Sequence, residues 1–312
     1  MINSTDQKRI WIFLAIAFGI SWATALVIYQ TGGLADSPIL AIGGGQLSLA
    51  LVLMATFYMF GPAVANILTR WITKEGRQNL LMKPNFDRRR WIYYVAAWVL
   101  PGVLTILGMA LYFLAFPGNY DSGLSVLSEQ MELLGADGIS PWAIVAAQTV
   151  QAIMVAPLLN GLPTFGEEFG WRGYLLPKLM PLGSRKAVLL SGVIWGVWHW
   201  PIILMGYNYG LDYFGAPFLG PLAMVWFTIV FGALLAWVTI KSGSVWPAVI
   251  GHGALNGIAG LSLIFIAGEP NTVLGPTPVG LIGGLGFTIL AVTLFQQPNA
   301  FKPIPEEMTN KP

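Results

Sequence analysis

The chain has 312 residues, of which 55% are hydrophobic and only 10% are charged, and its mean hydropathy is +0.67. Because a water-soluble domain carries roughly 25% charged residues, this composition excludes an ordinary soluble domain and predicts a membrane protein. The net charge of +2 gives no reason to expect nucleic-acid binding, and the absence of cysteine excludes disulfides, thiolate metal sites and cysteine nucleophiles.

Eight apolar segments are long enough to cross a bilayer, which takes about 20 apolar residues. In chain order they are Ile10–Tyr29, Leu47–Thr69, Trp91–Phe116, Pro141–Pro163, Ala187–Met205, Phe218–Ile240, Val245–Ile266 and Pro278–Phe295. An alternative start for the second segment is Ser37, with a break at the following glycine run. The sequence therefore predicts an all-α bundle of about eight transmembrane helices that forms a single polytopic membrane domain, residues 1–312.

The positive charges predict the orientation of these helices. If the N-terminus lies in the cytoplasm, all 16 Lys and Arg residues fall on the inner side, from Lys8 to Lys311. The outer loops then carry only acids, namely Asp36, Asp121, Glu129, Glu132, Asp137, Asp212 and Glu269. We therefore predict a multi-pass integral membrane protein with both termini inside, surrounded by a lipid bilayer. The compact chain favours a bacterial cytoplasmic membrane as that bilayer.

Two carboxylates remain when the acids of loops and tails are set aside, Glu167 and Glu168 in the stretch FGEEFGWRGYLLP. Both histidines of the chain, His199 and His252, also fall within predicted spans. Ionisable groups inside a membrane are costly and usually functional. Counted from the nearest inner cations at about 1.5 Å per helical residue, His199 lies about 20 Å deep, and Glu167 and His252 about 16 Å. Three segments thus bring polar groups to a similar depth.

The spacing around the two glutamates predicts different roles for them. Glu168 and Arg172 are four residues apart with the acid first, which is the favourable order for an ion pair on a helix. Such a pair would neutralise the arginine and fix the helix. Glu167 is rotated by about 100° from Glu168 and has no partner in its own helix. An unpaired carboxylate suits general acid–base work.

Spacings of four residues also relate Trp195 to His199 and His252 to Asn256, so that the members of each pair share a helix face. Taken singly, each of these residues has a structural interpretation. A lone membrane histidine more often forms a hydrogen bond between helices than acts in catalysis, and a lone asparagine joins helices in the same way. It is the combination, in spans with almost no other ionisable group, that favours a functional site.

Three motifs occur in a fixed order: E-E-x-x-x-R, aromatic-x-x-x-His and His-x-x-x-Asn. In this respect the chain resembles the CPBP family of intramembrane proteases, also called CAAX prenyl protease 2-like, type II CAAX endopeptidase or Abi family. The resemblance covers a core of about residues 141–260. One departure is Trp195, because the second motif commonly begins with Phe.

The resemblance implies an intramembrane endopeptidase, a hydrolase in which Glu167 activates water with help from His199. His252 and Asn256 would stabilise the oxyanion, for which preorganised donors are needed. Glu168, Arg172 and Trp195 would give structural support. The substrate would be a membrane-embedded or lipidated peptide or protein, such as a CAAX-type prenylated tail or a leader peptide.

Two questions stay open at this point. Members of the family are often classed as metalloproteases, and Zn²⁺ could be held by Glu167 or Glu168 together with His199 and His252. No H-E-x-x-H motif is present, and Glu168 is matched to Arg172, so we expect that no cofactor is required. The alternative functions are a proton-coupled transporter, in which membrane carboxylates and histidines carry protons, and a non-catalytic immunity or scaffold protein.

Overall fold

The computed structural model describes residues 2–136 and 138–304, so that Asp137 and Lys311, assigned above to the two sides, lie outside the described residues. The described chain is helical apart from one short hairpin, which confirms the predicted all-α class. Its elements are α1 Ser4–Gln30, β1 Ile39–Ile42, β2 Gly45–Ser48, α2 Leu49–Leu53, α3 Gly61–Ile72, α4 Trp91–Ala115, α5 Ser125–Leu133, α6 Pro141–Met154, α7 Ala156–Leu159, α8 Gly161–Gly170, α9 Leu176–Leu179, α10 Ser184–Trp198, α11 Trp200–Leu204, α12 Leu219–Ser242, α13 Trp246–Ile258 and α14 Leu285–Gln296.

Five helical stretches of the described chain are long and apolar enough to cross a membrane. They correspond to the first, second, third, sixth and seventh expected spans, and they identify an integral membrane protein. The other three expected spans coincide with shorter or interrupted helices: α6 to α8, α10 with α11, and α14. Two of the interruptions precede Pro157 and Pro201, because proline lacks the N–H that continues a helix. The count of eight spans and the orientation therefore stay predictions.

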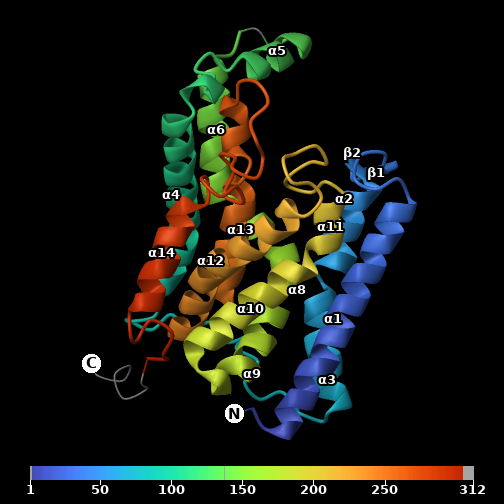
Figure 1. The fold of residues 1–312 in the computed structure, drawn as a ribbon, viewed down its shortest axis with the longest axis vertical. Helices are drawn as coiled ribbons and strands as arrows, with labels where there is room; N and C mark the ends of the chain where they lie inside the picture. Colours follow the sequence, from blue (N-terminus) through green and yellow to red (C-terminus); the bar gives the residue numbers. More distant parts are fainter. Residues whose placement is uncertain (1, 137, 305–312) are drawn as a thin grey trace.

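The helices form three adjacent groups (Figure 1). Helices α1 and α3 pack together on one side, and α4, α6 and α14 lie on the other. Between them lie α8, α10, α12 and α13; Glu167 and Glu168 are on α8, Trp195 is on α10, and His252 and Asn256 are on α13. Helix α12 contacts α10, α13, α14 and α4, and it is the most buried of the long helices. The site residues are therefore held in the middle of the bundle.

Helix α10 approaches α12 closely because two of its glycines face that helix. A Cβ atom on Gly192 would lie 2.7 Å from the Cα of Ile229, and one on Gly196 would lie 2.5 Å from the Cα of Val225. Small residues four apart allow this kind of contact between membrane helices. The Thr228 hydroxyl also donates a hydrogen bond of 2.9 Å to the Gly192 carbonyl. This contact fixes the helix that carries Trp195.

The outward faces of the peripheral helices are apolar. On α4, Val95, Val99 and Val103 follow one another at helical spacing with exposed fractions of 44%, 47% and 53%. Large apolar faces of this kind are not left to water in a stable protein. They fit the lipid bilayer that the composition predicts as the surroundings of the chain.

One group of charges joins the first turns of α1 to other segments of the chain. We call it the end cluster; it consists of Asp6, Arg9, Arg70, Glu75, Tyr174 and Lys178. Lys178 Nζ lies 2.7 Å from Asp6 Oδ1 and 2.6 Å from Glu75 Oε1. Burial raises the pKa of Glu75, but hydrogen bonds from Lys178 and Tyr174 outweigh it and hold this pKa below its ordinary value. The end cluster ties α1 and α3 to the segment that follows the Glu167–Glu168 pair.

Candidate active site

The two glutamates lie on α8, whose glycines pack against the end of the segment before α3 and against the first turn of α3. A Cβ on Gly166 would lie 2.7 Å from the Met59 carbonyl oxygen, and one on Gly170 would lie 2.3 Å from Pro62 Cβ. These two glycines, four residues apart, let the backbones approach closely. The intervening Glu167 and Glu168 are almost fully buried. The glycines of α8 thus allow the close packing that holds this helix in place, and the packing buries Glu167 and Glu168.

Glu168 joins two basic side chains. Its Oε1 accepts a hydrogen bond of 3.0 Å from Arg172 Nη1 and one of 2.9 Å from His252 Nδ1. The Glu168–Arg172 ion pair expected from the spacing is present, with side-chain exposures of 0% and 2%. Because a carboxylate can only accept, His252 carries its proton on Nδ1. Glu168 thereby fixes the tautomer of His252.

Arg172 lies on a π-helical segment, Trp171–Leu175, that directly follows α8. Such segments are rare and are frequent at functional sites. The Arg172 guanidinium carbon lies 4.1 Å from the centre of a Trp195 ring, which is a cation–π contact. Arg172 was counted above among the inner cations, but the structure places it in the interior of the bundle, where only 1% of it is exposed.

Glu167 has no ion pair within the described part of the chain. Its Oε2 accepts a hydrogen bond of 2.7 Å from the indole N–H of Trp195. The expectation that Glu167 has no partner in its own helix is therefore met, and its partner on α10 is a neutral donor. No hydrogen bond between Glu167 and His199 joins the described residues; both contact Trp195 instead. Oε1 is left to accept a further proton or hydrogen bond.

His199 lies where α10 ends, one residue before α11. Its Nδ1 is 2.8 Å from the Trp195 carbonyl oxygen. Because a carbonyl accepts, Nδ1 carries the proton and Nε2 is an acceptor. Pro201 interrupts the helix at this point, and the Trp198 carbonyl instead accepts hydrogen bonds from the Trp22 indole and the Tyr58 hydroxyl. These bonds hold the backbone on which His199 lies.

A cavity of about 340 Å³ brings the predicted residues together. Its lining includes Glu167, His199, His252 and Asn256. The imidazole centres lie 5.6 Å and 5.4 Å from the Trp195 ring centre, so they can be no more than about 11 Å apart. Asn256 is the exposed member, one helical turn beyond the buried His252. The four residues expected to act together thus line one cavity; their chemical roles stay predictions.

Several contributions were not expected from the sequence. The sequence predicted Trp195 only as an aromatic support beside His199. The planes of the Trp195 and His199 rings are tilted by 59°, and the indole N–H of Trp195 donates a hydrogen bond to Glu167. Glu168 was paired with Arg172 alone, and its contact with His252 was missed because it joins helices 84 residues apart. Tyr58 and Asn160 also line the cavity. No sequence motif pointed to Tyr58. In the structure it lies on a π-helical segment, Met54–Tyr58, which is a rare kind of helix.

The arrangement was compared with the needs of a zinc ion. Zinc ligands lie about 2.0–2.3 Å from the metal and therefore close to one another. The described residues contain no group of three or more His, Cys, Asp or Glu side chains placed to hold a metal ion. Glu168 Oε1 is also engaged by Arg172 and His252. As they stand, these side chains do not fit a zinc site, and we derive no step from one.

Two comparisons with known proteins bear on this site. Residues 141–258 match the family model described as type II CAAX prenyl endopeptidase Rce1-like. A protein of Methanococcus maripaludis named CAAX prenyl protease 2 is 32% identical over 92 residues, which cover 29% of this chain and 34% of that protein. This chain thus spans about a third of the length of the relative. The matches confirm the resemblance that the three motifs predicted.

Proposed function

We propose that this chain, which belongs to the CPBP/CAAX protease family through its residues 141–258, is an intramembrane endopeptidase that hydrolyses a peptide bond of a membrane-associated substrate. The observation that carries the proposal is the cavity in which Glu167 meets His199, His252 and Asn256. Glu167 is a buried carboxylate with a neutral donor as its partner, which is how a general base is kept available.

The hydrogen-bonding capacities of the four residues suit peptide hydrolysis. Glu167 Oε1 and His199 Nε2 are acceptors, and a water molecule has two protons to donate. A water held between them is oriented and loses one proton to Glu167 as its oxygen attacks the substrate carbonyl. The proton then passes to the nitrogen of the leaving amine as the C–N bond breaks. His252 and Asn256 donate hydrogen bonds to the oxyanion that forms.

In this mechanism, Glu168 holds His252 and does not take part in proton transfer to the substrate. Because Nδ1 of His252 faces the carboxylate, an imidazolium can be kept there and Nε2 can donate to the oxyanion. We propose that no metal is required. A prenylated CAAX-type tail or a leader peptide is the class of substrate proposed. Classification as a metalloprotease or Abi protein, and a bacterial cytoplasmic membrane as host, stay predictions.

The decisive experiment compares wild type with Glu167→Gln in detergent and in liposomes. A panel of membrane peptides, including a prenylated CAAX tail, is incubated with each protein, and the products are identified by mass spectrometry. Gln is nearly isosteric and cannot take the proton, so cleavage should fall by about 10²- to 10⁴-fold. Glu129→Gln is the matched control because Glu129 is exposed and distant from the cavity. Equal cleavage by wild type and Glu167→Gln would refute the proposed base.

The role of a metal is tested on the same peptides. Wild type should keep its activity after treatment with EDTA or 1,10-phenanthroline, and elemental analysis should find no stoichiometric zinc. Loss of activity with the chelator and recovery with added zinc would replace the metal-free mechanism. About one zinc per chain, lost together with activity in His199→Ala and His252→Ala, would replace it as well. Either result leaves the protease assignment in place.

A further inference from the structure

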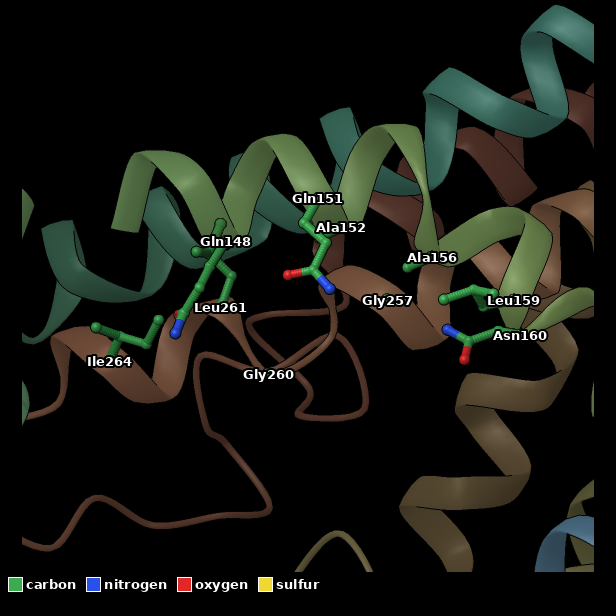
Figure 2. A pocket seen from close by; sticks show the side chains of 10 residues that line it. All are labelled: Gln148, Gln151, Ala152, Ala156, Leu159, Asn160, Gly257, Gly260, Leu261 and Ile264. Carbon is green, nitrogen blue, oxygen red and sulfur yellow. The ribbon is translucent and has the colours of Figure 1, made fainter. Parts of the chain in front are cut away.

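A second and larger hollow, of about 540 Å³, lies beside the cavity, between α6 and α7 on one side and the end of α13 on the other. We call it the α6–α13 groove. Figure 2 shows that Gln148 and Gln151 extend from α6 toward the segment Gly257–Leu261. Apart from Asn160, the remaining lining of the groove is small or apolar: Ala152, Ala156, Leu159, Gly260 and Ile264.

The two glutamines are unusual for their position. Both lie in the expected fourth span, both are exposed, and neither side chain makes a hydrogen bond within the described ranges. A polar side chain left without a partner in an apolar environment costs free energy. In membrane proteins such groups usually face the interior of a bundle or a functional path. The glutamines face the groove, so what they bind should come from outside the chain.

The groove adjoins the cavity at Asn160, which lines both. The Asn160 amide nitrogen donates a hydrogen bond of 3.2 Å to the Gly253 carbonyl, and this leaves its oxygen as an acceptor. On α13, His252 and Asn256 line the cavity, whereas the neighbouring Gly257 lines the groove. A chain lying in the groove would therefore reach the residues of the proposed active site.

The chemistry of the lining indicates an extended peptide. Inside a membrane an unwound segment must have its backbone N–H and C=O groups satisfied. A primary amide offers both donors and an acceptor, and the glycine and alanine floor leaves room for a backbone. From Gln148 to Asn160 the helical rise amounts to at most about 18 Å, because the helix is interrupted between α6 and α7. At roughly 3.3 Å per residue this length accommodates about five extended residues.

We propose that the α6–α13 groove binds about five extended residues of the substrate, to one side of the scissile bond, through the amides of Gln148 and Gln151. The proposal rests on the proposed protease function. It assigns Gln148 and Gln151 as residues that determine affinity and the length of substrate recognised. The bond to be cleaved then lies beyond Asn160, next to Glu167.

Two variants test the groove without disturbing the helices. A Cβ atom on Gly260 would meet no heavy atom within 4 Å, so Gly260→Leu fills the groove of an otherwise unchanged protein. Gln148→Leu with Gln151→Leu removes the amides and keeps the approximate side-chain volume. The controls are Gly118→Leu, where a Cβ also has free space, and Val150→Leu on an exposed position of α6 outside the groove.

Each variant is made in wild type for cleavage and in Glu167→Gln for binding of fluorescent peptides from the same panel. Gly260→Leu and the double glutamine variant should each weaken binding and raise KM by about 10-fold, because two amide hydrogen bonds or the space itself are lost. The value of kcat should barely change. Shortening the peptide from one end to two residues beyond the scissile bond should raise KM similarly and should abolish the difference between variants.

The outcomes separate the two proposals. If peptides bind but wild type does not cleave them, the protease function is refuted and the proposal for the groove stands. If peptides are cleaved with unchanged KM by all groove variants, the proposal for the groove is refuted and the protease function stands. If no peptide binds Glu167→Gln and none is cleaved by wild type, both proposals fail. If the double glutamine variant binds a prenylated peptide more tightly, while Gly260→Leu blocks it, the occupant is the lipid chain, and the peptide assignment is wrong.

Discussion

Two charged clusters in the described part of the chain are built differently. In the end cluster, the carboxylates of Asp6 and Glu75 both contact Lys178, and Arg9 and Arg70 approach them as well. We call Glu167, Glu168, Arg172, Trp195, His199 and His252 the buried cluster. It contains two carboxylates but one permanent cation, and that cation, Arg172, is paired with Glu168.

The difference lies in the carboxylate that is left over. In the end cluster every acid has a cation, its side chains are partly exposed, and such pairs serve to join elements. In the buried cluster Glu167 has only the neutral indole N–H of Trp195. A buried ion pair is weak support for stability by itself, and an unpaired acid gives none. This difference supports the reactive role proposed for the buried cluster, whereas the end cluster holds α1, α3 and the segment after α8 together.

The largest expected effect is on stability and comes from Glu168→Ala. Removing Glu168 leaves the guanidinium of Arg172 buried without its counter-ion, which costs roughly 3–5 kcal/mol. The melting temperature in detergent should fall steeply, and cleavage should be lost because His252 also loses its partner.

The matched comparison is the double variant Glu168→Gln with Arg172→Met, which removes both charges. It should recover much of the lost stability without recovering cleavage. A melting temperature that is unchanged in Glu168→Ala while cleavage is lost would assign the chemistry to Glu168 and contradict the division of roles between the two glutamates.

The second effect concerns Trp195→Phe, which keeps an aromatic ring and removes the N–H that Glu167 accepts. A hydrogen bond to a charged group is worth about 1.5–3 kcal/mol, so kcat should fall by about 10-fold or more while KM stays nearly constant. Trp171→Phe is the control, because Trp171 is also fully buried and its indole nitrogen makes no hydrogen bond within the described chain. Equal kinetics in the two variants would make Trp195 a packing residue only.

Much of the buried cluster could be predicted from the sequence. Glu168 and Arg172 are one turn apart, as are His252 and Asn256, so their shared faces follow from helix geometry. Counting residues from the nearest inner cations predicted a similar membrane depth for Glu167 and the two histidines. This count is possible because few charges interrupt the apolar segments. The structure places these residues in the lining of one cavity, whereas their common depth in the membrane stays a prediction.

Contacts between distant segments could not be predicted in this way. The bond from Trp195 to Glu167 depends on the close approach of α10, α8 and α12, which glycines permit but do not specify. The helix interruptions before Pro157 and Pro201 were also missed. The mean hydropathy of a segment does not change where the helix loses one or two backbone hydrogen bonds. Composition predicts that a segment is apolar, whereas its continuity depends on local backbone chemistry.

The third effect is on the end cluster and should be smaller. Lys178→Met removes the cation shared by Asp6 and Glu75 and should cost about 1 kcal/mol, because partly exposed pairs are screened by water. The loss should shrink in high salt, in contrast to that of Glu168→Ala. Lys186→Met is the control, since Lys186 is exposed and forms no ion pair among the residues described. A loss as large as that of Glu168→Ala would erase the distinction between the clusters.

The smallest effect is the pH dependence contributed by Glu75. Burial raises the pKa of Glu75, but the hydrogen bonds from Lys178 and Tyr174 together lower it by more than burial raises it. The folded pKa therefore lies below the unfolded value of about 4.3. Stability from this group is therefore fully present above the unfolded pKa and is lost as the pH falls through the folded pKa. Melting temperatures of wild type and Glu75→Gln should differ at pH 7 and converge below about pH 4. Parallel curves from pH 7 to pH 3 would show that the end cluster does not bind the Glu75 carboxylate more strongly than water does. Cleavage by Glu75→Gln at pH 7 should match wild type, because Glu75 does not line the cavity.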